Sequence, residues 1–230
     1  MVCQLAISRH TTVFVIFVPR GFYNDAGFTG LPVLEQNKGS KLWDKQLIGY
    51  TFVTLRSVGE QPGGATPDYI GPWHTLPENT FIATNKFNLP ATYTDVFDPP
   101  LPAAPTIRMY RVFGFARAND PLNSSSPKIP FPSEDAFDPK LSNRTFATVP
   151  YIAFNYLGQL VSGPAGRDEY IPLARGTVAH SRDPQTRVPR KALPELVENP
   201  PGNSTNAFNL IHIDRLTGRA RLIHQEISGS

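Results

Sequence analysis

Residues 11–18 read TTVFVIFV, and this stretch decides the fold. Every side chain in it is β-branched or aromatic, which is the composition that strands favour. A short, continuous run of this kind is typical of a strand buried on both faces. Pro19 follows directly and ends the run, because proline cannot donate to a strand ladder. The stretch therefore predicts a central strand of a sheet.

Further strand patterns follow along the chain and are separated by turn-rich segments. Alternating or β-branched residues predict strands at 46–57, 80–84, 107–116, 148–156, 170–174, 208–214 and 219–227. The last two are joined by the turn at 215–218, where Gly218 supplies the positive φ that a hairpin turn needs. Residues 19–45 read as loop. The pattern predicts a domain that is mainly antiparallel sheet.

The first ten residues, MVCQLAISRH, fit one or two turns of helix. An isolated helix this short is marginal in water, so it must pack on the sheet or continue upstream. We therefore expect an α+β fold in a single domain over residues 1–230, with a helix stub packed on a mainly antiparallel sheet. Residues 1–10 are its N-terminal helix and residues 11–230 its globular head.

Long polar or proline-rich insertions separate the strands. They cover residues 97–106, 119–144 and 181–205. The first has the proline content of extended polyproline conformation, and the others are longer than most loops of compact domains. Loops of this length often carry function, so we expect them to be the first candidates for contact surfaces.

Composition excludes several classes of protein. The 230 residues include 24 Pro, which disfavours a helical bundle, and 15 Phe and 8 Tyr, which supply a core and argue against full disorder. The formal net charge is only +3, with both signs mixed along the chain, so we expect no nucleic-acid partner. The single Cys3 excludes a disulfide framework and a cysteine-based zinc site.

A search for catalytic and metal-binding patterns finds no strong signature, so we expect no cofactor, no metal, no small-molecule substrate and no enzyme activity. The first alternative is a β-sandwich that binds carbohydrate through an aromatic platform of Trp73 with Tyr69 or Tyr50. A second alternative is a hydrolase that uses His212, Asp214 and His224, since alternate residues of a strand share a face.

Four pieces of the chain resemble, in the same order, the globular domain of minor pseudopilins of the H type and the FimT-like proteins. Residues 5–18 resemble the junction between a long N-terminal helix and the first strand, and residues 73–80 the start of a later strand. Residues 151–158 resemble a strand and turn, and residues 211–222 the final hairpin. The positions that match the family's motifs are Ala6, Arg9, Val13, Trp73, Leu76, Pro77, Phe154, Gly158, Asp214, Gly218 and Arg219.

The resemblance implies a non-catalytic structural subunit of a type II secretion pseudopilus or a type IV pilus. Its partners would be other pilin-like subunits and the secretion machinery, at the periplasmic face of the inner membrane of a bacterial cell envelope. Members of the family carry a membrane helix before the head, and residues 1–10 then correspond to its last turns. The resemblance thus implies that the native chain starts upstream of Met1 and that it meets the membrane only through this helix.

Overall fold

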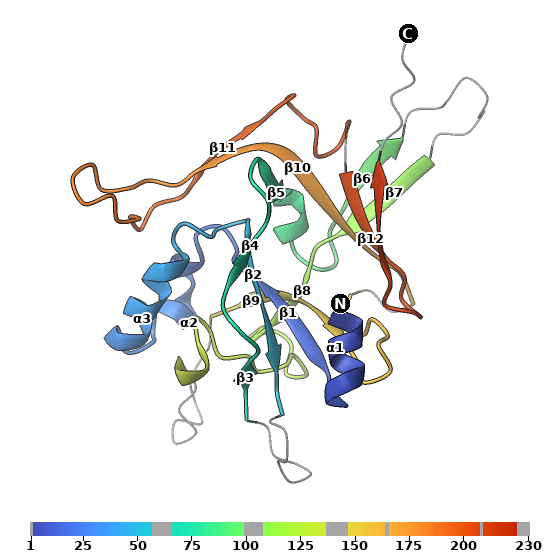
Figure 1. The fold of residues 1–230 in the computed structure, drawn as a ribbon, viewed down its shortest axis with the longest axis horizontal. Helices are drawn as coiled ribbons and strands as arrows, with labels where there is room; N and C mark the ends of the chain where they lie inside the picture. Colours follow the sequence, from blue (N-terminus) through green and yellow to red (C-terminus); the bar gives the residue numbers. More distant parts are fainter. Residues whose placement is uncertain are drawn as a thin grey trace.

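The computed structural model describes residues 2–56, 66–98, 108–136, 147–163, 166–207 and 209–224. Its architecture is mostly antiparallel β-sheet with few helices, which confirms the α+β expectation at this level. The helix predicted at residues 1–10 is α1, Val2–Arg9. Figure 1 shows α1 at the lower right, beside the end of the molecule that carries the last hairpin.

The first sheet is built around the apolar stretch at residues 11–18. That stretch forms β1, Val13–Phe17, and all five of its residues are buried, as predicted. The strand order is β3-β2-β1-β9-β8, with β4 also paired to β2. The bounds are β2 Gly49–Thr54, β3 Asp68–Tyr69, β4 His74–Thr75, β8 Ala116–Ala118 and β9 Val149–Phe154.

A second sheet contains the C-terminal strands in the order β11-β10-β12-β13, with β5 paired to β10. A separate hairpin, β6 with β7, packs against β10 and β12 through a small apolar cluster that includes Val96, Val112 and Leu210 (Figure 1). The bounds are β5 Thr80–Ile82, β6 Tyr93–Asp98, β7 Arg108–Phe113, β10 Glu169–Ala179, β11 Glu195–Glu198, β12 Asn209–Ile213 and β13 Ala220–His224.

The two faces of β1 contribute to two different parts of the core. Phe14 and Ile16 point into one cluster, whereas Val13, Val15 and Phe17 point into the other, because successive strand residues face opposite sides. The first cluster is covered by residues of the 19–45 segment. The second lies between the first sheet, the second sheet and α1. Burial on both faces explains why β1 has no polar alternation.

The expectation that residues 19–45 form only a loop is wrong. They contain α2, Ala26–Thr29, and α3, Val33–Gly39, with 3-10 turns at Phe22–Asn24 and Ser40–Leu42. The Asp25 side chain accepts a hydrogen bond from the Gly27 amide and caps α2. These turns hold Phe22, Phe28 and Leu42 over one face of the first sheet. Helices this short gain their stability from that contact, so their sequence shows little periodicity.

The three insertions contain more regular structure than expected. Strand β6 ends inside the first one, at Asp98, and residues 99–107 lie outside the described part of the chain. The second has a 3-10 turn at Glu134–Ala136 before residues 137–144, which also lie outside it. The third is not a continuous loop, because β11 forms in it by pairing with the second half of β10. Strand β10 accordingly runs well past the predicted 170–174.

One buried ion pair joins the second sheet to the segment before β6. Lys86 lies in the 3-10 turn Thr84–Phe87, and its ammonium group donates to Glu169 at the start of β10 and to the Phe113 carbonyl oxygen. Neither side chain of the pair is more than 4% exposed. Burial lowers the pKa of Lys86, although the Glu169 carboxylate favours its charged form. The ion pair therefore holds the turn Thr84–Phe87 in place against β10.

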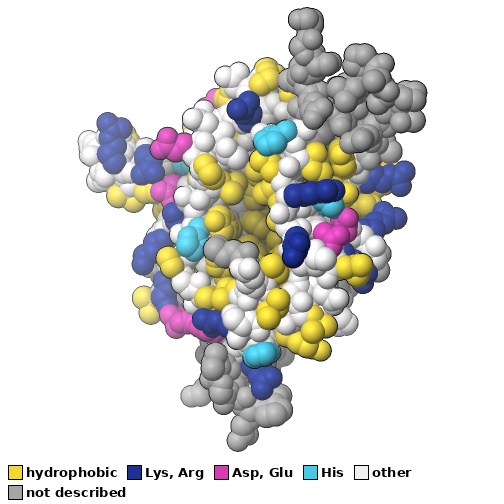
Figure 2. Space-filling view, turned by 45° about the vertical axis from the view of Figure 1, so that its right-hand side comes forward, with side chains coloured by type: hydrophobic (Ala, Val, Ile, Leu, Met, Phe, Trp, Pro, Cys, Tyr) yellow, Lys and Arg dark blue, Asp and Glu magenta, His cyan; other side chains and the backbone are white. Residues whose placement is uncertain are grey.

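The side of the molecule that bears the second sheet has an apolar hollow. Figure 2 shows hydrophobic side chains gathered near the centre of this face, with Lys and Arg side chains beside them. Within the described ranges, no helix has both the length and the hydropathy needed to cross a membrane.

Candidate functional site

The structure brings together several motif residues that are far apart in the sequence. Ala6 of α1 is fully buried and belongs to the same apolar cluster as Val13 of β1 and Phe154 of β9. Helix α1 lies against both of these strands. Because Ala6 has a small side chain, the helix backbone can approach the sheet closely. We call this contact the helix junction and define it by Ala6, Val13, Phe154, Gly158 and Gly218.

Two glycines complete the helix junction from the turns after β9 and β12. Gly158 and Gly218 have φ values of 80° and 62°, which side chains rarely adopt. A Cβ atom on Gly218 would lie 1.9 Å from the Gly158 carbonyl oxygen and 3.1 Å from the Cys3 Cβ. One on Gly158 would lie 2.9 Å from the Ile7 side chain. Both turns are therefore pressed against α1 and against each other.

The remaining motif residues lie elsewhere. Arg9 forms an ion pair with Asp68 of β3, with a 3.0 Å separation between Nη1 and Oδ2. Trp73 packs on the opposite core cluster from Leu76, and the Pro77 carbonyl oxygen accepts from Thr80 in the turn before β5. Asp214 and Arg219 flank the last turn, where Arg219 is exposed. The structure thus gathers five of the eleven motif residues at the helix junction.

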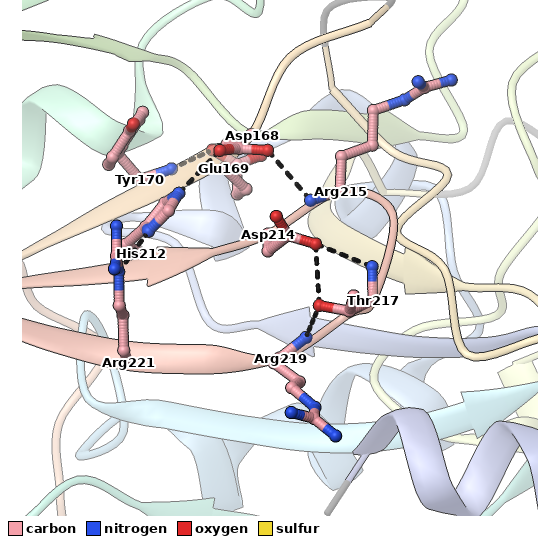
Figure 3. Close-up of polar contacts among 9 residues, drawn as sticks. All are labelled: Asp168, Glu169, Tyr170, His212, Asp214, Arg215, Thr217, Arg219 and Arg221. Atoms are coloured by element: carbon pink, nitrogen blue, oxygen red, sulfur yellow. Dashed lines mark hydrogen bonds and ion pairs between the residues drawn. The ribbon is translucent and has the colours of Figure 1, made fainter.

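A polar cluster joins β10 to the final hairpin, as Figure 3 shows. The His212 ring lies between Asp168 and Arg221, with Nε2 2.7 Å from the Asp168 Oδ2. The Arg221 Nε donates to the His212 Nδ1 at 2.8 Å, so Nδ1 is the acceptor and the proton of a neutral ring is on Nε2. The Tyr170 ring stacks on the imidazole at 4.9 Å.

The carboxylates of this cluster are held in their charged form. The Arg215 amide donates to Asp168 Oδ1 at 3.0 Å and, with the His212 hydrogen bond, lowers the pKa of Asp168 below its ordinary 3.8. Asp214 accepts from the Thr217 hydroxyl and amide, and these two bonds lower its pKa as well. Asp214 therefore stabilises the turn before β13 rather than facing His212.

The three residues of the hydrolase alternative do not converge. His212 pairs with Asp168, Asp214 with Thr217, and His224 with Asn209 through a 2.7 Å contact. Both nitrogens of His212 are engaged, so the ring has no free position for taking a proton from a substrate. Across the described ranges, no group of three or more His, Cys, Asp or Glu side chains is placed to hold a metal ion. The cluster therefore links the start of β10 to β12 and β13 through side-chain hydrogen bonds.

Sequence reasoning missed Asp168 and Arg221 as partners of His212. The chain does show Asp168-Glu169 as an acidic pair, but nothing local connects it to a histidine 44 residues away. The connection comes from strand register, because Tyr170 pairs with His212 and His212 pairs with Arg221 across the sheet. Two successive strand pairings are needed to build the cluster.

The proposed aromatic platform is also divided. Tyr69 and Trp73 pack on one core cluster, whereas Tyr50 packs on the other and stacks on His74. The Tyr69 hydroxyl donates to the Pro130 carbonyl oxygen at 2.5 Å, and burial raises the pKa of Tyr69 strongly. These rings therefore do not form a row on one open face that could stack against a sugar.

Comparisons with protein-family models, with curated proteins and with solved structures found no match to this chain.

Proposed function

We propose that this chain is the head of a non-catalytic structural subunit of a pilus-like assembly, either a type II secretion pseudopilus or a type IV pilus. The helix junction is the observation that carries the proposal. Three of the four segments that resemble H-type pseudopilins meet beside α1, where a Cβ atom added at Gly158 or Gly218 would lie about 3 Å from an α1 side chain. Close packing at the helix junction explains why Ala6, Gly158 and Gly218 are small residues, and no catalytic role is needed to explain them.

Apolar side chains around α1 support a role in assembly. Ile7 of α1, Leu157 in the turn after β9 and Leu216 in the turn after β12 are 46%, 58% and 66% exposed. These side chains lie on the three segments that meet at the helix junction. Exposed apolar groups that gather on neighbouring segments mark contact surfaces for other proteins. In an assembly, they would be covered by a neighbouring subunit or by secreted cargo.

In this proposal, α1 is the last part of a membrane helix that begins upstream. The head would then lie at the periplasmic face of the inner membrane, and the helix would pack against equivalent helices of other subunits. Head-to-tail contacts between similar subunits form open filaments when the rotation between them does not close. The long insertions and the apolar side chains around α1 would determine which subunit lies next in the filament.

The DNA directly upstream of the Met1 codon tests this proposal. We expect an in-frame segment that encodes Gly-Phe-Thr-Leu-x-Glu followed by about 20 apolar residues, which is the length that spans a bilayer. The longer protein should then fractionate with inner membranes and cross-link to other pilin-like subunits. An in-frame stop codon directly before Met1 would overturn the membrane-anchored subunit.

A further inference from the structure

A cleft lies between the end of β7, strands β8 and β9, residues 161–163 and Arg167. Its volume is about 650 Å³, which is within the range of small-molecule sites. Phe113 and Tyr151 supply aromatic walls, and Arg117 and Arg167 supply positive charge. A second cavity of about 500 Å³ shares Phe113 and Arg167 with the first. The two cavities therefore adjoin and could accommodate successive units of a chain-like ligand.

Among the described residues, the three arginines of this double cleft form no ion pair. Arg117 donates to the Phe87 carbonyl oxygen at 3.2 Å, and Arg167 lies 5.0 Å above the Phe113 ring. Arg111, which lines the second cavity, lies over Tyr93. Within the described ranges, none of the three has a carboxylate partner, whereas Asp168 is already bonded to His212 and to the Arg215 amide. A guanidinium group in this state favours a carboxylate from a ligand.

These features together favour a carbohydrate that carries carboxylates. An aromatic side chain can pack its ring against the apolar C–H face of a sugar ring. Asp120 and Asn123 line the same cavity and can accept from ring hydroxyls. The unpaired arginines then distinguish an acidic sugar from a neutral one, because a neutral sugar leaves them without a counter-charge.

We propose that the double cleft binds an acidic oligosaccharide, with a uronate carboxylate between Arg117 and Arg167 and a sugar ring against Phe113 and Tyr151. A hydroxyl of the ring donates to Asp120, which lines the same cavity. The second cavity, with Arg111 and Tyr170, receives the next sugar unit. This proposal is independent of assembly through the helix junction, since the two regions use different residues.

The test is calorimetric titration of the whole chain with tetragalacturonate at low salt. Its methyl ester has the same rings without the charges, so it serves as the matched neutral ligand. The variant Arg167→Gln removes one exposed guanidinium from the cleft. Arg175→Gln is the matched control, because Arg175 is equally exposed on β10 but lines neither cavity. Circular dichroism checks that both variants fold.

We expect saturable binding of tetragalacturonate that is at least tenfold tighter than binding of the methyl ester. Arg167→Gln should weaken it about tenfold, the loss typical of a charge-assisted hydrogen bond, while Arg175→Gln leaves it unchanged. Equal binding of both ligands, equal losses in both variants, or no binding at millimolar concentration would each overturn the proposal. Equally tight binding of hexaglutamate would overturn specificity for a sugar and show that the cleft binds any polyanion.

Discussion

Glycine at position 218 meets two separate requirements at once. Its φ of 62° favours glycine by backbone sterics, and its α-carbon faces the Gly158 carbonyl oxygen at a distance that excludes a side chain. The turn pattern in the sequence predicts the first requirement. The second comes only from packing, because residues 158 and 218 meet through different sheets. A single residue thus connects the final hairpin to α1.

Replacing Gly218 by alanine should destabilise the protein by roughly 3 kcal/mol or more, since strain at positive φ and a clash with backbone add together. Chemical denaturation measures the loss. Gly71→Ala is the matched control, because its φ is 92° but nothing lies within 4 Å of an added Cβ. That variant should lose only about 1–2 kcal/mol. Equal losses in the two variants would contradict tight packing at the helix junction.

The pH dependence of stability should report on Asp168. Because its pKa is lowered in the folded state, this carboxylate stabilises the fold at pH values above its unfolded pKa. The contribution is lost as the pH falls below about 4 and through the folded pKa. Asp168→Asn should therefore destabilise the protein at pH 5.5 and have less effect at pH 3.

The effect of Asp168→Asn at pH 5.5 should be about 1 kcal/mol or less, because the Asp168 side chain is 35% exposed and solvent screens it. Urea denaturation at the two pH values gives the difference directly. A destabilisation that stays constant between pH 5.5 and pH 3 would show that the variant acts through packing instead.

At the scale of elements, strand β10 organises the second half of the chain. Its first half pairs with β12 on one side, and β5 and β11 pair with its later residues. The predicted strand at 170–174 covers only its first half, because exposed and half-buried positions alternate in its second half and resemble a polar loop. The start of β10 is held by Glu169 through the ion pair with Lys86.

Breaking this ion pair should loosen the contact between β10 and the segment before β6. Lys86→Met leaves Glu169 charged and buried without a cation, which typically costs about 3–5 kcal/mol. The double variant Lys86→Met with Glu169→Gln removes both charges, and its Gln side chain can still accept from the Tyr170 amide. The double variant should therefore recover at least half of the loss in urea denaturation. If the losses of the single variants Lys86→Met and Glu169→Gln simply add up to the loss of the double variant, the two side chains are not coupled.

At the scale of the whole molecule, the two sheets meet through one apolar cluster. It contains Phe52 and Ile152 from the first sheet, Ile171 and Ile213 from the second, and Ala6 from α1. Residues from the beginning, middle and end of the chain therefore share one core. The helix junction and the double cleft share no residue, so assembly and ligand binding can use different side chains.

Local sequence patterns predict the central strand, the N-terminal helix, the final hairpin and the mainly antiparallel character of the sheets. These features depend on local patterns, such as the continuous apolar run at residues 13–18 and the turn glycine at 218. Patterns of this kind act within a few residues, so they can be recognised in the chain before it folds.

Only the tertiary structure decided the partners of these elements. The short helices between residues 19 and 45 exist because they cover a sheet, and β11 exists because it pairs with β10. His212 meets Asp168 instead of Asp214 because strand register, and not proximity in sequence, sets which side chains face each other. The cleft arginines likewise come from three separate segments, and long-range packing alone places them around two adjoining cavities.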